Sequence, residues 1–231
     1  MNTFKLIKSS FVFIFLFLLT QSCMPDLMID YEGHRVFNPT YLFYLESESR
    51  NEWQKPYKII KALGLSEGDV IADIGAGGGY FTEKFSHKVG KTGHVYSTDV
   101  QNVMIENLNK RVKKKKLSNV TVIQSGFNNP RLPKNSCDIV FFSSVYKEIE
   151  DRIGFLKKVK KSLKKKGRIA IIGYRKWSTT SGPYREDRLK TDQIIKELKT
   201  VGCQLSESFD FIPDQYFLLF KKSKNLKLQS Q

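Results

Sequence analysis

The chain has 231 residues, of which 40% are hydrophobic, and a formal net charge of +16 at pH 7. This length favours one domain of about 200 residues with a small appendage rather than two domains. The charge favours anionic partners such as lipid headgroups, nucleic acid or phosphorylated small molecules, without indicating a reaction. Three cysteines and three histidines at wide spacing argue against a disulfide framework and against a metal site.

Residues 1–23 have the pattern of an export signal. Two lysines precede the apolar block 11–19, which is too short for a membrane-spanning helix of about 20 residues. The end of this segment resembles a bacterial lipobox that stops at Cys23, although Thr20 stands where such motifs usually have leucine. We therefore expect membrane association, through lipidated Cys23 after cleavage of a signal peptide or through an uncleaved N-terminal anchor.

Secondary-structure patterns follow in a regular order. A helical pattern covers 41–63, and apolar runs typical of strands then alternate with helical patterns. The predicted strands are 70–74, 94–98, 120–124, 138–142, 168–172, 205–211 and 216–220, and the predicted helices are 80–89, 101–116, 149–164 and one that Thr191 caps and Gly202 ends. Because most strand runs are continuously apolar, we predict a Rossmann-like, doubly wound, mostly parallel seven-stranded sheet with helices on both faces.

Lysine-rich runs at 110–116 and 157–168, together with a basic tail at 223–231, supply much of the positive charge. A nucleic-acid surface usually has aromatic residues interleaved with its basic ones, and these runs have none. We therefore expect solvated helix faces and consider a nucleic-acid partner improbable.

A glycine-rich turn follows the first predicted strand, in the sequence Asp73-Ile74-Gly75-Ala76-Gly77-Gly78-Gly79-Tyr80. Ligands of open parallel sheets bind at such a strand end, where the winding direction switches. Glycines allow a positive φ and leave no Cβ between ligand and backbone. The dinucleotide fingerprint G-x-G-x-x-G would need a glycine at position 80, where Tyr80 stands.

This turn, which reads D-x-G-x-G-x-G, resembles motif I of class I S-adenosylmethionine (SAM)-dependent methyltransferases, and the resemblance covers roughly residues 60–221. It implies that SAM is the cofactor and that Asp73 lies near its amino group. It further implies that the backbone of Gly75, Ala76 and Gly77 holds the methionine part.

The resemblance also assigns residues at the ends of later strands. Asp99 would hold the ribose and Val100 would pack on the adenine, although an acid at this position would also suit NAD. Many relatives have an acidic residue after the next strand, whereas this chain has Ser125-Gly126-Phe127-Asn128, so we expect Phe127 to stack on the adenine instead. Ser143, after the fourth strand, completes the predicted cofactor site.

The acceptor is expected near the loop 143–149, where we predict Tyr146 to orient the acceptor and Glu148 to act as a base. For Glu148 the alternative is a charge that complements the helix macrodipole. The loop lacks the N-P-P-Y signature of enzymes that methylate the amino group of adenine or glutamine, which argues against those acceptors.

The sequence thus predicts a substrate-side helical segment at 24–64 and a methyltransferase domain at 65–222. The favoured function is methylation of a small or lipid-like acceptor. One rival is a non-catalytic lipoprotein that binds SAM or a related nucleoside, and another is a nucleic-acid methyltransferase, against which the lack of an appended recognition domain argues. The side of the membrane that the domain faces stays open, because SAM is made in the cytoplasm whereas a cleaved lipoprotein signal would export the chain.

Overall fold

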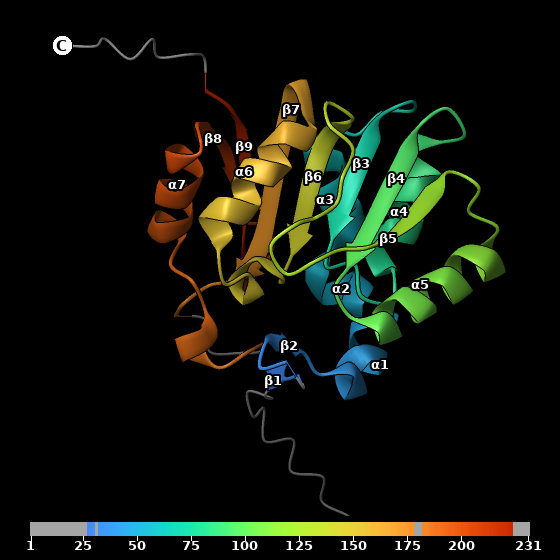
Figure 1. Ribbon diagram of the computed structural model, residues 1–231, viewed down its shortest axis with the longest axis horizontal. Coiled ribbons are helices and arrows are strands. Elements are labelled where there is room, and N and C mark those ends of the chain that lie inside the picture. Colours follow the sequence, from blue (N-terminus) through green and yellow to red (C-terminus); the bar gives the residue numbers. More distant parts are fainter. Residues whose placement is uncertain (1–26, 31, 178–181, 224–231) are drawn as a thin grey trace, which may run out of the picture.

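The computed structural model describes residues 27–30, 32–177 and 182–223. Its centre is a seven-stranded sheet (Figure 1). The strands are β3 (Val70–Ile74), β4 (His94–Asp99), β5 (Val120–Gln124), β6 (Cys137–Ser143), β7 (Leu163–Tyr174), β8 (Cys203–Phe209) and β9 (Gln215–Lys222). Their order is β5-β4-β3-β6-β7-β9-β8, and β9 alone runs opposite in direction to the other six strands. The predicted fold class, a Rossmann-like and mostly parallel sheet, is confirmed.

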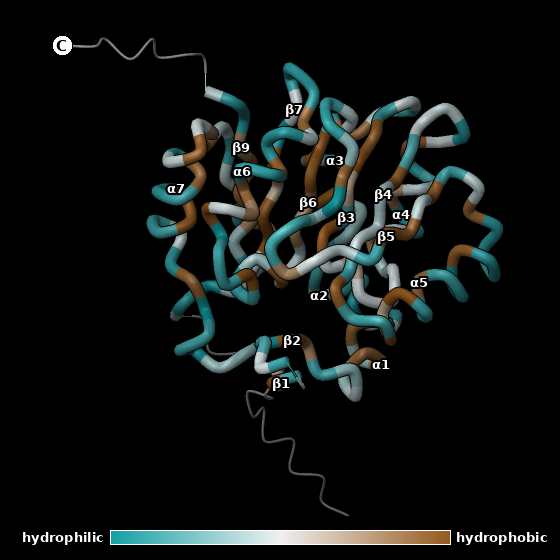
Figure 2. Tube along the Cα trace, viewed as in Figure 1, coloured by the Kyte–Doolittle hydropathy of each residue, from teal (hydrophilic) through white to brown (hydrophobic). Residues whose placement is uncertain are grey.

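Helices cover both faces of the sheet (Figure 1). The helices α3 (Pro56–Leu63) and α4 (Tyr80–Val89) pack on one face, and α6 (Arg152–Ser162) and α7 (Thr191–Thr200) pack on the other. A further helix, α5 (Asn102–Lys115), contacts β4 and β5. The central strands are largely hydrophobic in Figure 2, and their side chains are buried on both faces of the sheet.

Strand β6 shows why its sequence is continuously apolar. Phe141 points to the α4 face, where its ring centroid lies 4.9 Å from that of Phe81 and 5.0 Å from that of Phe85. The next residue, Phe142, points to the opposite face and contacts Phe155 of α6. Both phenylalanines of β6 are fully buried. An alternating polar pattern would leave one of these two faces without a core.

The N-terminal segment corrects one prediction, because the single helix expected over 41–63 is wrong. The segment forms a hairpin of β1 (Leu27–Ile29) and β2 (Arg35–Phe37), the 3-10 turn η1 (Pro39–Tyr41), and the helices α1 (Leu42–Leu45), α2 (Arg50–Gln54) and α3. The break before α3 lies at Lys55, which has a φ of 52°. Pro56 disfavours a helical conformation for the residue before it and cannot donate to the preceding turn, so a new helix begins there.

Two helix boundaries also differ from the predictions. Thr191 is the first residue of α7 and does not cap it, since the cap position belongs to Lys190 and no side chain caps that end. Helix α6 begins only at Arg152, after the 3-10 turn η2 (Tyr146–Glu148), because the carboxylate of Asp151 accepts a bond from the Gly154 N–H and fixes the start there. At the end of α7, Gly202 follows the last turn with a φ of 74°, as predicted.

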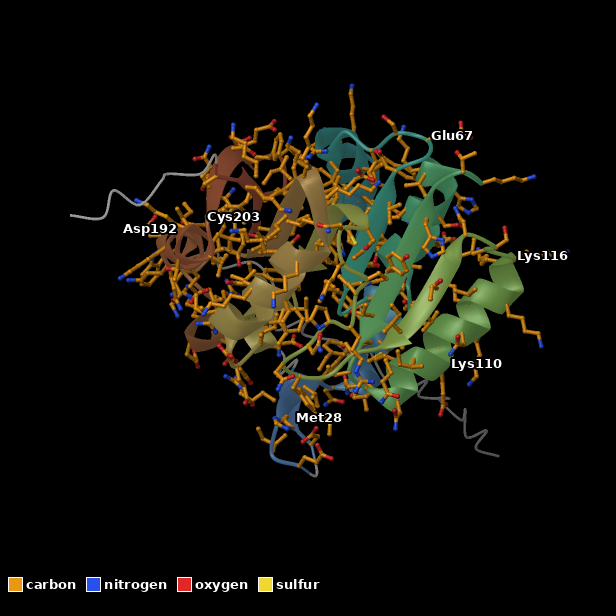
Figure 3. The ribbon with its side chains drawn as sticks, turned by 45° about the horizontal axis from the view of Figure 1, so that its top comes forward. Met28, Glu67, Lys110, Lys116, Asp192 and Cys203 are labelled. Carbon is orange, nitrogen blue, oxygen red and sulfur yellow. The ribbon has the colours of Figure 1, made fainter. Side chains whose placement is uncertain are left out.

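The lysine-rich run on α5 faces outward, as Figure 3 shows for Lys110 and Lys116, and both residues are exposed. The prediction of a solvated face is confirmed for the lysines of this run, whereas Arg111 is half-buried and pairs with Glu46 and Glu83. The two described cysteines, Cys137 and Cys203, are buried in the core, 0% and 1% exposed. The predicted signal segment 1–23, with Cys23, lies outside the described residues, as does nearly all of the predicted basic tail.

Candidate active site

A cavity of about 600 Å³ opens at the carboxyl ends of β3, β4 and β6. Its size lies within the usual range for small-molecule and cofactor sites. The glycine turn and the loop after β6 form one side, and the N-terminal segment closes the other through 35–37 and 41–46. Figure 1 shows β1, β2 and α1 lying together beyond this edge of the sheet. The wall is mostly apolar, with a few carboxylates and the two arginines Arg35 and Arg50 between the apolar groups.

The glycine turn takes its shape from positive φ angles, which are 63° at Gly75, 57° at Gly77 and 93° at Gly79. A side chain at Gly75 would also collide with the loop after β6, because a Cβ there would lie 2.4 Å from Cγ2 of Val145. Glycine is therefore required at this position for two independent reasons. The turn leaves a bare backbone surface facing the cavity.

The N–H groups of the turn are partly used within the protein. Ala76 donates to the carbonyl of Thr98 at 3.0 Å, and Gly77 donates to the carboxylate of Asp99 at 3.0 Å. Gly75, Ala76 and Gly77 all line the cavity, where the sequence predicts them. Two of their N–H groups thus hold the turn in place, and the residues form the floor of the site.

Asp99 faces the cavity from the end of β4, with only 7% of its surface exposed. Its carboxylate accepts backbone bonds from Gly77 and from Gln101, each at 3.0 Å. Burial raises the pKa of this carboxyl, and the backbone bonds oppose that rise. A carboxylate has about four acceptor positions, so these bonds leave capacity for ligand hydroxyl groups. Asp99 thus lies where a ribose diol would be held.

Asp73 lies at the wall of the same cavity, 2% exposed, at the end of β3. Its carboxylate accepts a bond from the hydroxyl of Thr82 at 2.7 Å. Burial raises the pKa of Asp73 to about 7, although the Thr82 bond and the positive charge of Arg50 both lower it. A cationic ligand group beside this carboxylate would lower its pKa further. The site therefore provides a buried acid suited to an ammonium group.

Val100, Phe127 and Ser143 also line the cavity. The ring of Phe127 stacks on His34 of the β1–β2 connection, with centroids 3.8 Å apart and planes at 27°. One face of Phe127 is therefore already covered, and stacking on an adenine would use the other face. The hydroxyl of Ser143 accepts a bond from the side-chain amide of Gln54 at 3.2 Å.

The predicted role of Tyr146 in orienting the acceptor does not agree with its position. Tyr146 is 1% exposed, belongs to the core on the α6 face, and does not line the large cavity. Its hydroxyl donates to Glu197 at 2.7 Å, and Arg152 binds the same carboxylate at 2.9 Å. Burial and the bond to Glu197 raise the pKa of Tyr146 far above its usual range. The residue holds η2 and α6 against α7 instead of facing a ligand.

Glu148, two residues further along η2, does line the cavity. Its carboxylate lies 3.6 Å from the amine of Lys147, and its side chain is 16% exposed. Of the two residues predicted to act on the acceptor, Glu148 therefore faces the cavity and Tyr146 does not. Its role as a base stays a prediction.

Two features of the site are absent from the sequence predictions. The first is Arg50 of α2, which faces the cavity although it lies in the polar run Ser49-Arg50-Asn51-Glu52. The second is the hairpin, which the side-chain amide of Gln101 holds over the site by donating to the carbonyl of Phe37 at 3.0 Å. A short polar run usually indicates a solvated surface, and nothing in the sequence indicates either contact.

Neither a metal centre nor a membrane helix is evident in the part of the chain that the structure describes. In that part, no three His, Cys, Asp or Glu side chains gather closely enough to bind a metal ion. No described helix has both the length and the apolar character needed to cross a bilayer.

Comparison with known proteins agrees with this geometry. The family model described as "Methyltransferase domain" matches residues 65–225. The chain is 30% identical over 131 residues to an uncharacterized methyltransferase of Bacillus subtilis, covering 57% of this chain and 67% of the relative. It is 29% identical over 123 residues to the ubiquinone/menaquinone biosynthesis C-methyltransferase of Pasteurella multocida, covering 51% of this chain and 44% of the relative. The match to the latter thus covers less than half of that protein.

A solved structure resembles the fold over most of its length. The SAM-dependent methyltransferase from Aquifex aeolicus is 29% identical, has a TM-score of 0.78, and is matched over 81% of this chain and 100% of that one. The glycine floor, the buried ribose-side carboxylate of Asp99 and the buried acid Asp73 fit SAM, which combines a nucleoside with a charged amino-acid end. The chain therefore belongs to the methyltransferase-domain family, as a class I SAM-dependent methyltransferase.

Proposed function

We propose that this protein transfers the methyl group of SAM to a lipid-like acceptor at a membrane surface. The observation that carries the proposal is that exposed apolar side chains of α1 and the hairpin surround the opening of the cavity, which we call the cavity mouth. Phe43 and Tyr44 of α1 line the cavity and are 75% and 45% exposed. On β1, Met28 and Ile29 are 40% and 60% exposed, and Figure 3 shows Met28 on the hairpin that projects beyond the sheet. Exposed apolar and aromatic side chains of this kind suit a membrane interface.

The N-terminus supports the same proposal through chain length. The apolar block ends at Leu19, and the described chain begins at Leu27 in β1, beside the cavity mouth. Even a fully extended chain between these residues spans at most about 28 Å. A membrane anchor in this block, or a lipid on Cys23, would therefore keep the cavity mouth close to the bilayer. The name of one relative refers to lipid-soluble quinones, which fits an acceptor of this class.

The main task of the protein in this reaction is to position the acceptor and the methyl donor. Bound SAM supplies a methyl group that is already activated by the sulfonium. The protein holds the acceptor in line with that group at near-attack distance, which is the main source of acceleration in such a displacement. The apolar wall between α1 and the loop after β6 excludes water. Glu148 takes the proton from an acceptor that must lose one.

The experiment uses the full chain, vesicles that contain lipids extracted from the source cells, and SAM labelled in its methyl group. We expect label in the organic phase, and we expect Phe43→Ser to lower both vesicle binding and label transfer. The control is Tyr57→Ser on α3, because Tyr57 is 72% exposed but does not line the cavity. Label found only in water-soluble products would exclude a lipid-like acceptor. SAM binding with no transfer to any fraction would favour the non-catalytic alternative.

The mode of anchoring needs a separate experiment, for which we propose labelling with palmitate. Incorporation that is lost in Cys23→Ser would identify a lipidated N-terminus. Membrane association without any label would indicate an uncleaved segment. Release of the chain into the soluble fraction, with no label, would contradict membrane association altogether.

A further inference from the structure

Arg50 is a buried cation at the wall of the cavity, and no carboxylate pairs with it among the described residues. It is 8% exposed. Its Nη1 donates to the carbonyl of Leu45 at 2.7 Å, and its Nε donates to the side-chain carbonyl of Gln54. Both partners are neutral. No Asp or Glu oxygen of the described chain comes within 4.0 Å of its guanidinium.

The surroundings of Arg50 place it next to the glycine turn. Its guanidinium carbon lies 4.1 Å from the ring centroid of Tyr80 and 5.3 Å from that of Phe81, the first two residues of α4. Helix α4 begins directly after the turn, so Arg50 reaches the part of the cavity where the methionine end of SAM is expected. The negative charge of Asp73 raises the pKa of Arg50, but Asp73 lies too far from the guanidinium to form an ion pair.

An uncompensated buried charge is costly, and an anionic ligand removes that cost. Burial lowers the pKa of Arg50 to about 10, which is the direction expected for a cation without a counter-ion. A second donor in the same wall has no partner either. Trp53 lines the cavity, and its indole N–H is buried without a hydrogen-bond acceptor in the described structure. Two donors without anionic partners on one wall indicate a site for an acidic ligand group.

We propose that Arg50 binds the carboxylate of the amino-acid end of SAM, opposite Asp73, which takes the ammonium group. The two buried side chains then match the two charges of one zwitterion. Arginine suits this task because its planar guanidinium can donate two parallel bonds to a carboxylate. The proposal rests on SAM as the methyl donor and is independent of the acceptor. It also gives the N-terminal segment, which lies outside residues 65–225, a direct part in donor recognition.

The test compares SAM with decarboxylated SAM, which lacks only the carboxylate. Binding of both ligands to the full chain in detergent is measured by calorimetry, with no acceptor present. The wild type is expected to bind SAM at least tenfold more tightly than decarboxylated SAM. In Arg50→Met this preference disappears through weaker SAM binding, while the affinity for decarboxylated SAM changes less than twofold. Arg50→Lys keeps part of the preference because it keeps the charge.

Two controls separate this role from a structural one. Arg188 is also buried, 3% exposed, but it does not line the large cavity, so Arg188→Met keeps the preference for SAM. Asp73→Asn weakens both ligands and keeps the preference as well. Equal losses for both ligands in Arg50→Met would make Arg50 a structural residue and overturn the proposal. An unchanged preference would overturn it too, and a wild type that binds neither ligand would reject SAM as the donor.

Discussion

The carboxylate of Asp99 accepts a hydrogen bond from the backbone N–H of Gly77 at 3.0 Å, which ties the end of β4 to the turn after β3. The group expected to hold the ribose and the floor expected to hold the methionine part are therefore mechanically joined. Movement of one displaces the other. The bond thus sets the spacing between two subsites of a single ligand.

Replacing Asp99 tests the ribose subsite. Asp99→Ala is expected to weaken SAM binding by about 1.5 to 3 kcal/mol, because hydrogen bonds to a charged group are lost. Calorimetric titration measures the change. Asp210→Ala is the control, since Asp210 is exposed and does not line the cavity. An affinity for SAM equal to that of the wild type would remove Asp99 from the site.

The glycine at position 75 is expected to be indispensable for stability. Gly75→Ala adds a Cβ that meets Val145 at 2.4 Å, on a backbone with a φ of 63°. Overpacking of this kind costs about 1 to 3 kcal/mol, in addition to the left-handed strain. Gly33→Ala separates the two effects, because Gly33 has a φ of 87° but no atom within 4 Å of an added Cβ. Urea unfolding should show a clearly larger loss for Gly75→Ala, and equal losses would refute the clash.

Asp73 predicts a pH dependence of stability in the absence of ligand. Its pKa is raised from 3.8 to about 7 by burial, so the folded state holds the proton more strongly than the unfolded state. The contribution to stability is therefore complete below about pH 4 and is lost as the pH rises towards 7. Relative to wild type, Asp73→Asn should gain up to about 1.4 kcal/mol per pH unit across this window.

The free energy of unfolding, measured in urea at pH 5, 6, 7 and 8, checks this expectation for both proteins. SAM binding should show the reverse trend, since an ammonium group prefers the ionised form of Asp73. The affinity of the wild type for SAM is thus expected to rise as the pH increases from 6 to 8. Parallel stability profiles for the two proteins would show that Asp73 ionises normally in the fold.

Tyr146 is expected to matter for stability and not for methyl transfer. Tyr146→Phe removes one hydrogen bond to the charged Glu197, which costs about 1.5 to 3 kcal/mol. Arg152 still neutralises that carboxylate. The unfolding free energy should fall while the kcat for methyl transfer at 20 °C stays within a factor of two. A large loss of kcat with unchanged stability would restore the catalytic role.

Glu148 is expected to behave in the opposite way. If its carboxylate removes a proton from the acceptor, Glu148→Gln lowers kcat by about 10²- to 10⁴-fold, the usual contribution of a general base. SAM affinity and the unfolding free energy stay close to the wild-type values. Single-turnover transfer to the lipid fraction measures the effect. A normal rate in this variant would show that the acceptor needs no base, or that another group supplies it.

The sheet and the donor side of the site could be predicted from sequence because their signals are local. Continuous apolar runs mark strands buried on both faces, and Phe141 and Phe142 of β6 show this directly. The glycine turn and Asp99 can also be recognised locally, since the turn directly follows one such run and Asp99 ends another. All eight residues assigned to the cofactor line the cavity.

The rest of the site depends on contacts between distant parts of the chain. Tyr146 and Glu148 stand two residues apart in one loop. Tyr146 turns away from the cavity because it packs on Phe142 and donates to Glu197 of α7, contacts that no local pattern indicates. The polar residues around Arg50 in the sequence are typical of an exposed surface, whereas the fold packs its guanidinium against Tyr80. The break between α2 and α3, by contrast, has a local signal, because Pro56 disfavours a helical conformation at Lys55 despite the helical spacing of the apolar residues around it.

Because the N-terminal segment closes one side of the cavity, the choice of chain boundaries decides whether an expressed fragment contains the whole site. The residues that the family model matches begin at Leu65, yet 35–37, 41–46 and Arg50 all precede it. A fragment limited to the residues that the family model matches would keep the glycine turn and lose the N-terminal wall of the cavity. Such a fragment would expose the donor groove to solvent on one whole side, and its failure to bind SAM would say nothing about the intact protein.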